Sequence, residues 1–213
     1  MPLRNRVDPY GRLHAVEARG AWMGNRGVLH DEAKRVVAAW RSRRWIACAL
    51  TFRGRRRSVF APHRYSELFF LDEATALAAG HRPCAECRRR RYEEFRAAWT
   101  AGRGGIGSRL PGAEEIDRVL HSERVSRGGG KKTYEAVLSS LPAGTIVDHR
   151  GRPYLKWEGK ALPWSFSGYG RAEELPEPPP ETTVRVLTPR SIVRAMRSGL
   201  VPQVDASAIV SAR

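Results

Sequence analysis

The sequence predicts an α+β fold, with a small N-terminal part of β-hairpin and helices and a small C-terminal β-meander or barrel. Three observations lead to this prediction. The first half alternates short apolar runs with helix signals and contains the pair Cys84 and Cys87. The second half has short β-type runs separated by glycine turns between 145 and 169, a pattern typical of antiparallel sheets. A Gly-rich segment, 101–112, separates the halves.

The expected domain organisation follows from this Gly-rich segment. We expect a basic domain over 1–100, a linker over 101–112, and a helix with a small β-rich domain over 113–213. Domains usually contain about 100–200 residues, so a chain of 213 residues allows one large or two small domains. Within the second part, residues 174–181 (ELPEPPPE) have the composition of an extended linker.

The first elements are predicted from caps and apolar runs. Asp31 is a suitable N-cap for a helix over 32–41. The apolar run 45–52 (WIACALTF) predicts a strand, followed by an arginine-rich turn and a return strand over 58–61. A third strand is expected over 65–71 (YSELFFL).

Two helices are expected next. Asp72 is a good N-cap for a helix over 73–79, and Gly80 is a common residue just past a helix end. Pro83 suits the first position of a helix, which we expect to run from Cys84 to about residue 100.

The second half contains weaker helix signals around the β-runs. A helix is expected over 113–124, followed by a flexible basic loop over 126–132. The β-meander is expected within 145–169. A strand over 183–187 and a helix over 189–198 complete the prediction.

The charge of the chain is strongly positive. There are 38 Lys and Arg against 22 Asp and Glu, a net charge of +16, with most of the excess in the first 100 residues. Such a field attracts polyanions, so nucleic acid is the expected partner. No apolar run approaches the ~20 residues of a membrane span, and the N-terminus has no stretch of signal-peptide type. We therefore expect a cytoplasmic protein without membrane association.

Three arginine clusters are the candidate contacts to phosphate. One follows the cysteine pair on the expected helix, another occupies the expected turn after the first strand, and Arg41, Arg43 and Arg44 form the third. Arginine forks suit phosphate contacts, which add affinity without reading the sequence. The alternative is a solvated face with local ion pairs to Glu93 and Glu94. The candidate nucleic-acid-binding residues are Arg55, Arg56, Arg57, Arg88, Arg89, Arg90 and Arg91.

The three cysteines favour metal binding over disulfide formation. An odd number of cysteines in a chain without an export signal argues against a disulfide framework. Cys84 and Cys87 are three residues apart and can reach one tetrahedral zinc ion as thiolates. A position at a helix N-terminus, beside Arg82, would lower the thiol pKa.

The segment 65–87 (YSELFFLDEATALAAGHRPCAEC) resembles the zinc-binding domain of Ada, the bacterial DNA alkylation-response protein. The same unit is similar to a module appended to some bacterial nucleases. The matching features are a strand with two aromatic residues, a short helix and Arg-Pro-Cys-x-x-Cys. The resemblance implies structural zinc and favours DNA over RNA. The segment 67–89 also resembles a group of uncharacterised proteobacterial proteins, which implies no function.

This sequence departs from the Ada pattern upstream of the cysteine pair. The family has four cysteine ligands, whereas only Cys48 precedes the pair here. His63, 21 residues before Cys84, is the next candidate. The predicted metal ligands are therefore Cys84 and Cys87 with Cys48 and His63. Cys48 also fits a small apolar residue within a strand, and His81 is expected to pack. The methyl-accepting cysteine motif is absent, so phosphotriester repair is not implied.

Two other functions remain open. His121, Glu123 and Lys131 could form a phosphodiester-cleaving site, with histidine as general base and lysine stabilising negative charge. Such a protein would be a metal-dependent nuclease or another phosphodiesterase. Alternatively, Cys84 and Cys87 could form a redox dithiol, or the chain could be a protein-interaction module.

Overall fold

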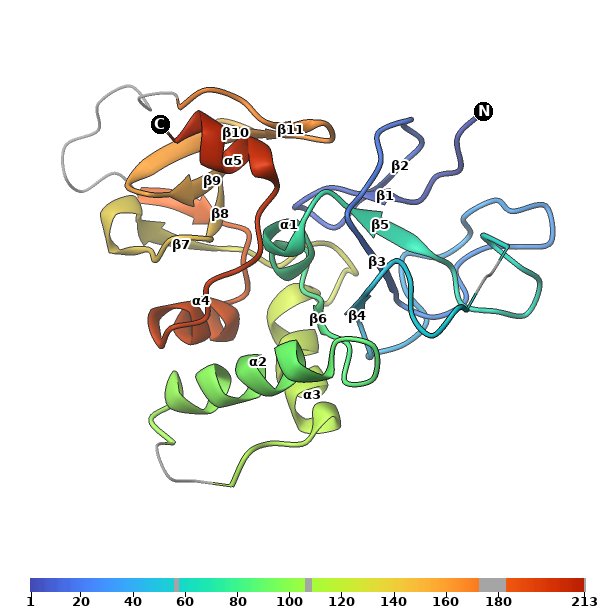
Figure 1. Ribbon diagram of the computed structural model, residues 1–213, viewed down its shortest axis with the longest axis horizontal. Coiled ribbons are helices and arrows are strands. Elements are labelled where there is room, and N and C mark those ends of the chain that lie inside the picture. The colour runs from blue at the N-terminus through green and yellow to red at the C-terminus, as the bar shows by residue number, and fades with distance from the viewer. Residues whose placement is uncertain (56–57, 106–108, 173–182, 213) are drawn as a thin grey trace.

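The computed structural model describes residues 1–213 except 56–57, 106–108, 173–182 and 213. The described residues form two six-stranded sheets with α-helices between and beside them, so the α+β prediction is confirmed (Figure 1). In the described part of the chain, no helix is both long and apolar enough to cross a bilayer. The expected linker 174–181 lies outside the described residues.

The first sheet is built from short strands in the order β2-β1-β5-β3-β4-β6. Its strands are β1 (Arg6–Val7), β2 (Leu13–His14), β3 (Trp22–Asn25), β4 (Ile46–Cys48), β5 (Leu68–Phe70) and β6 (Arg82–Pro83). The strand expected over 45–52 is shorter than predicted, and residues 58–61 form a turn instead of a return strand. β4 pairs with β3 antiparallel and with β6 parallel, which brings residues far apart in sequence to one edge.

The helix expected over 32–41 is absent, because Asp31 stabilises a turn instead. Its carboxylate accepts hydrogen bonds from the Arg35 backbone N–H at 2.9 Å and from Arg35 Nε at 2.8 Å. Lys34 adopts a positive φ of 59°, which interrupts any helix, and His30 bridges to Val36. Side-chain bonds from aspartate to nearby backbone compete with helix formation in this way.

Helix α1 (Glu73–Ala78) begins and ends close to the predicted positions. Asp72 is its N-cap and accepts a hydrogen bond from Thr75 N at 2.8 Å. Gly80 adopts a φ of +91° just past the end, a conformation that glycine adopts without strain. Local signals were sufficient here because cap and terminator lie within a few residues of the helix.

The helix expected from Cys84 begins only at Arg89, because Pro83 belongs to a strand. Pro83 pairs with Ala47 in the edge strand β6, where a missing N–H is tolerated. Residues 84–88 then form a turn that the Arg88 N–H closes on the Cys84 carbonyl at 3.2 Å. Helix α2 (Arg89–Ala101) follows.

The second sheet contains the predicted meander as three consecutive antiparallel strands. Its order is β11-β10-β9-β8-β12-β7. The strands are β7 (Tyr134–Val137), β8 (Ile146–His149), β9 (Arg152–Trp157), β10 (Lys160–Ser165), β11 (Gly168–Tyr169) and β12 (Thr183–Val186). A 3-10 turn, η1 (Leu138–Ser140), follows β7.

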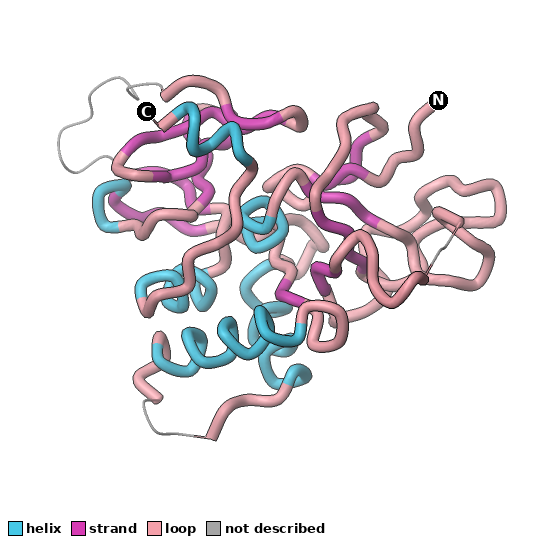
Figure 2. Tube along the Cα trace, viewed as in Figure 1, coloured by secondary structure: helices cyan, strands magenta, loops and turns pink. Residues whose placement is uncertain are grey.

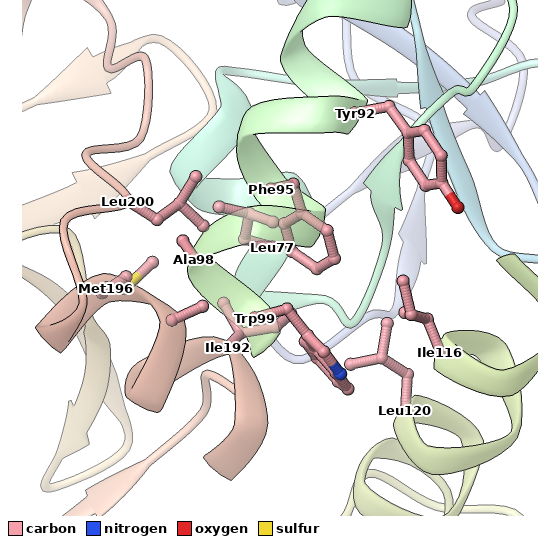
Figure 3. Close-up of a cluster of buried hydrophobic side chains, with 11 residues drawn as sticks. Leu77, Tyr92, Phe95, Ala98, Trp99, Ile116, Leu120, Ile192, Met196 and Leu200 are labelled. Atoms are coloured by element: carbon pink, nitrogen blue, oxygen red, sulfur yellow. The ribbon is translucent and has the colours of Figure 1, made fainter. Parts of the chain in front are cut away.

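Three helices, α2, α3 (Ala113–Arg124) and α4 (Arg190–Arg197), pack together at one end of the molecule (Figure 2). Helix α5 (Ala206–Ser211) lies apart from them, beside β11. A buried cluster joins α2 through Phe95 and Trp99, α3 through Leu120 and α4 through Ile192 (Figure 3). The core therefore continues across the Gly-rich segment 101–112.

Candidate metal centre

Three cysteine side chains converge at the edge of the first sheet. Cys48 ends β4, whereas Cys84 and Cys87 lie in the turn between β6 and α2. Their sulfur atoms all lie within 4.8 Å of one another. Cys48 and Cys84 are buried and Cys87 is partly exposed, and all three are free thiols. A soft divalent ion such as zinc is the type of metal that such a sulfur set suits.

The parallel pairing of β4 with β6 creates this cluster. Ala47 lies opposite Pro83, and the Cys84 N–H donates to the Ala47 carbonyl at 2.9 Å. This register places Cys84 beside Cys48, the next residue of β4. The turn after β6 then returns Cys87 to the same point, where its sulfur accepts the Ala49 N–H at 3.4 Å.

Hydrogen bonds to the sulfurs favour the thiolate form of the pair. The pKa of Cys84 is lowered to about 5, chiefly by the hydrogen bond from Cys48 and then by backbone N–H groups of Cys87 and Glu86, against burial. The pKa of Cys87 is also lowered, first by Cys48 and then by the Ala49 N–H. Cys48 holds the shared proton, so its pKa is raised. The causes are local hydrogen bonds, not the helix N-terminus expected from the sequence.

The spacing of the sulfurs fits a tetrahedral metal. Zinc with Zn–S bonds of about 2.3 Å holds its sulfurs ~3.8 Å apart. The sulfurs of the cluster lie within 4.8 Å of one another, close to this spacing. A cavity of about 260 Å³ adjoins the sulfurs and is also lined by Asn25, Glu67 and Glu86. The three sulfurs therefore leave room for a fourth ligand on the cavity side.

His63 does not join the cysteines. It lies in an exposed turn with a φ of +59°, outside the group of potential ligands that the described residues form. Glu67 lines the cavity, but its Oε2 already accepts the Phe60 N–H at 2.9 Å. His81 is fully buried and packs against Trp45 and Phe70, as expected.

Two of the four arginines after the cysteine pair point into the protein. Arg88 is 7% exposed and donates to Glu73 Oε1 at 2.7 Å, with its guanidinium 3.7 Å from the ring centre of Trp22. Arg91 forms a two-pronged ion pair with the same Glu73, which also accepts the Gln203 N–H. These two cations connect α1, α2 and the C-terminal segment, so they are structural.

The other predicted arginines are exposed and largely neutralised where they are described. Arg89 and Arg90 are exposed on α2 and pair with glutamates one turn later, Glu93 and Glu94. These pairs are the alternative that the sequence left open. Arg55 pairs with Glu86 at 2.7 Å, beside the cysteine cluster. Arg56 and Arg57 lie outside the described residues.

The structure does not bring His121, Glu123 and Lys131 to one point. His121 packs edge-on against Trp40, with ring centres 4.7 Å apart. Glu123 accepts the Ser191 N–H and hydroxyl, so it binds the first residues of α4. Lys131 donates to the Ala78 carbonyl.

Sequence reasoning missed a second group of polar side chains. Arg26 and Arg124 are buried, 2% and 1% exposed, and both guanidiniums lie over the ring of Trp45. An isolated arginine in a glycine-rich loop and another at a helix end carry no local signal of burial. Their proximity depends entirely on tertiary packing.

Comparison of the chain with protein-family models, with curated proteins and with solved structures gave no match.

Proposed function

We propose that the chain is a zinc-stapled protein that binds nucleic acid through its phosphate backbone. The observation that carries the zinc assignment is the convergence of Cys48, Cys84 and Cys87 within 4.8 Å. Three cysteine thiolates favour metals that bind sulfur well, and among these zinc has no redox chemistry. The zinc would tie β4 to the turn before α2, in a sheet whose strands are only two to four residues long.

The nucleic-acid assignment rests on cations that have no internal partner. The exposed loop before β4 contains three arginines within four residues: Arg41, Arg43 and Arg44. Their side chains form no ion pair with the residues that the structure describes. The chain as a whole carries a net charge of +16. Exposed arginines without carboxylate partners are available for phosphate, whereas the paired Arg89 and Arg90 are not.

Neutralising two of these arginines is expected to weaken binding to mixed-sequence DNA. For Arg43→Gln combined with Arg44→Gln, we expect a fall of roughly tenfold in affinity at low salt. The slope of log affinity against log salt should become less steep by about 2, because each phosphate contact releases about one counterion. Fluorescence anisotropy at several salt concentrations measures both quantities.

The matched control is the pair Arg89→Gln and Arg90→Gln, which removes the same charge from exposed positions that are already ion-paired. We expect a smaller loss of affinity for this control. Equal effects of the two double variants would mean that only net charge matters. Binding that does not respond to salt would contradict the proposal. Replacing DNA with RNA of the same sequence tests the preference for DNA.

A further inference from the structure

A second cavity, of about 610 Å³, lies where the loop after α3 meets the first sheet. Among the described residues, its lining includes six basic side chains and no aspartate or glutamate. The basic residues are Arg4, Arg12, Arg26, Arg124, Lys131 and Arg185. Of these six, Arg185 pairs with Asp148 at 3.0 Å.

Arg26 is buried without a carboxylate partner. Its Nε donates to His81 Nε2 at 3.2 Å and its Nη1 donates to the Gly11 carbonyl at 2.8 Å. Its Nη2 is buried and has no hydrogen-bond partner. Burial lowers the pKa of Arg26 to about 9, because removal from water disfavours the charged guanidinium.

Arg124 repeats this situation from the end of α3. It donates to the backbone carbonyls of Gly80 and Arg43, at 2.7 and 2.6 Å, while its Nε is buried and unpartnered. The guanidinium carbons of Arg26 and Arg124 lie 4.1 and 4.3 Å from the ring centre of Trp45. The indole therefore holds two like charges together, as cation–π contacts allow.

Lys131 adds a third cation to this group. Its ammonium donates to the Ala78 carbonyl, and the residue lines the same cavity. Burial, and then the charges of Arg26 and Arg124, lower the pKa of Lys131 to about 7, whereas Asp8 acts in the opposite direction.

The carboxylates that act electrostatically on these three cations, Asp8 and Asp117, are hydrogen-bonded elsewhere. Asp8 accepts from His14 Nε2 and from the Arg12 N–H, each at 2.8 Å. Asp117 receives both prongs of Arg82, at 2.9 and 2.8 Å. Neither carboxylate is hydrogen-bonded to the three cavity cations, so their charge has no bonded counter-ion within the described residues.

We propose that this cavity binds a phosphate-type dianion, the phosphomonoester group of a small metabolite or of a nucleic-acid end. Buried cations are costly unless an anion compensates them, and Arg26, Arg124 and Lys131 line one cavity without a bonded carboxylate among the described residues. A volume of about 610 Å³ is in the range of small-molecule sites and exceeds what inorganic phosphate needs. The inference does not rest on the proposed backbone binding or on zinc.

Calorimetric titration of the purified chain with matched probes tests the ligand class. The probes are inorganic phosphate, AMP against adenosine, and a short oligonucleotide with a 5′-phosphate against the same strand with a 5′-hydroxyl. We expect each phosphomonoester to bind at least about tenfold more tightly than its unphosphorylated partner, the worth of one charge-assisted hydrogen bond. A higher affinity for AMP than for the 5′-phosphorylated oligonucleotide would identify a metabolite site. A higher affinity for the oligonucleotide would identify a site for strand ends. Equal affinities within both matched pairs would overturn the proposal.

Lys131→Met tests the location of the site. We expect binding of the preferred phosphomonoester to weaken about tenfold, while thermal stability in phosphate-free buffer is unchanged or higher, because an uncompensated cation is removed. Lys132→Met is the matched control, since Lys132 is exposed and donates only to the Ser122 carbonyl. It should leave affinity unchanged. Arg26→Gln, with its fold verified by circular dichroism, should weaken binding as well. Retained affinity in both Lys131→Met and a folded Arg26→Gln would overturn the location.

The affinity for sulfate should depend on pH through Lys131. Sulfate stays dianionic across the range, so the protein's groups set the dependence. The charged groups facing Lys131 are Arg26, Arg124 and Asp8, with the neutral His81 nearby. Because the anion favours the ammonium form, affinity should be highest below pH 7 and fall by about tenfold in total between pH 6 and 8, the same loss as in Lys131→Met. In Lys131→Met this fall between pH 6 and 8 should disappear; a fall of equal size in the variant would contradict the assignment.

Discussion

Replacing Cys84 by serine is expected to lower zinc affinity on the order of 100-fold or more, equivalent to about 3 kcal/mol. Cys84 contributes the sulfur with the most strongly lowered pKa and shares hydrogen bonds with both other cysteines. Because the proposed zinc ion would bind the folded state, the variant should also melt at a lower temperature, and the difference should vanish when a chelator is present. Competition with a chromogenic chelator and thermal melts measure the two effects.

His63→Ser is the control for this experiment. His63 is exposed and lies outside the sulfur cluster, so zinc affinity should not change. Zinc affinity in Cys84→Ser equal to that of the unaltered chain would contradict the three-thiolate centre. A loss of affinity in His63→Ser would restore histidine as the fourth ligand.

Glu73→Gln is expected to cost about 3–5 kcal/mol of folding free energy, the range for breaking a buried ion pair from one side. Glu73 is 1% exposed and bonds Arg88, Arg91 and the Gln203 N–H. Its loss leaves Arg88 buried and uncompensated, and it loosens the C-terminal segment. Urea denaturation measures the change in the free energy of unfolding.

Glu93→Gln provides the comparison on the same helix. Its pair with Arg89 is exposed on both sides, so we expect a change below about 1 kcal/mol. If Glu73→Gln were as mild as Glu93→Gln, the role assigned to Glu73 and the inward-facing arginines would be wrong.

Elements with local signals were predictable from the sequence. α1 has its cap and its terminating glycine within nine residues, and α3 was predicted over the observed 113–124. The meander of β8, β9 and β10 follows from alternating runs with glycine turns between them. In each case the information lies within the element itself.

The sequence predicted two helix starts wrongly, because the residues that signalled them are also common in other structures. Asp31 caps a tight turn as well as it would cap a helix, and the positive φ of Lys34 decides for the turn. Pro83 suits both a first helical position and an edge strand, and its pairing with Ala47 selects the strand. Only tertiary contacts resolve such ambiguities.

The two candidate sites differ in how much of each was visible in the sequence. The spacing of Cys84 and Cys87 indicated metal directly, and Cys48 was a candidate because few cysteines exist. The pairing that unites them was not predictable, since β4 and β6 are separated by more than 30 residues. The cavity cations Arg26, Arg124 and Lys131 come from three segments far apart in the sequence. No sequence motif indicates that they lie together.

X-ray absorption at the zinc edge would show whether three sulfurs hold one zinc ion. For purified protein, with zinc content measured on the same sample, we expect one zinc per chain. It should have three sulfur neighbours at about 2.3 Å and one lighter neighbour. A zinc shell with fewer than three sulfurs, or a folded chain that takes up no zinc at all, would contradict the three-cysteine centre.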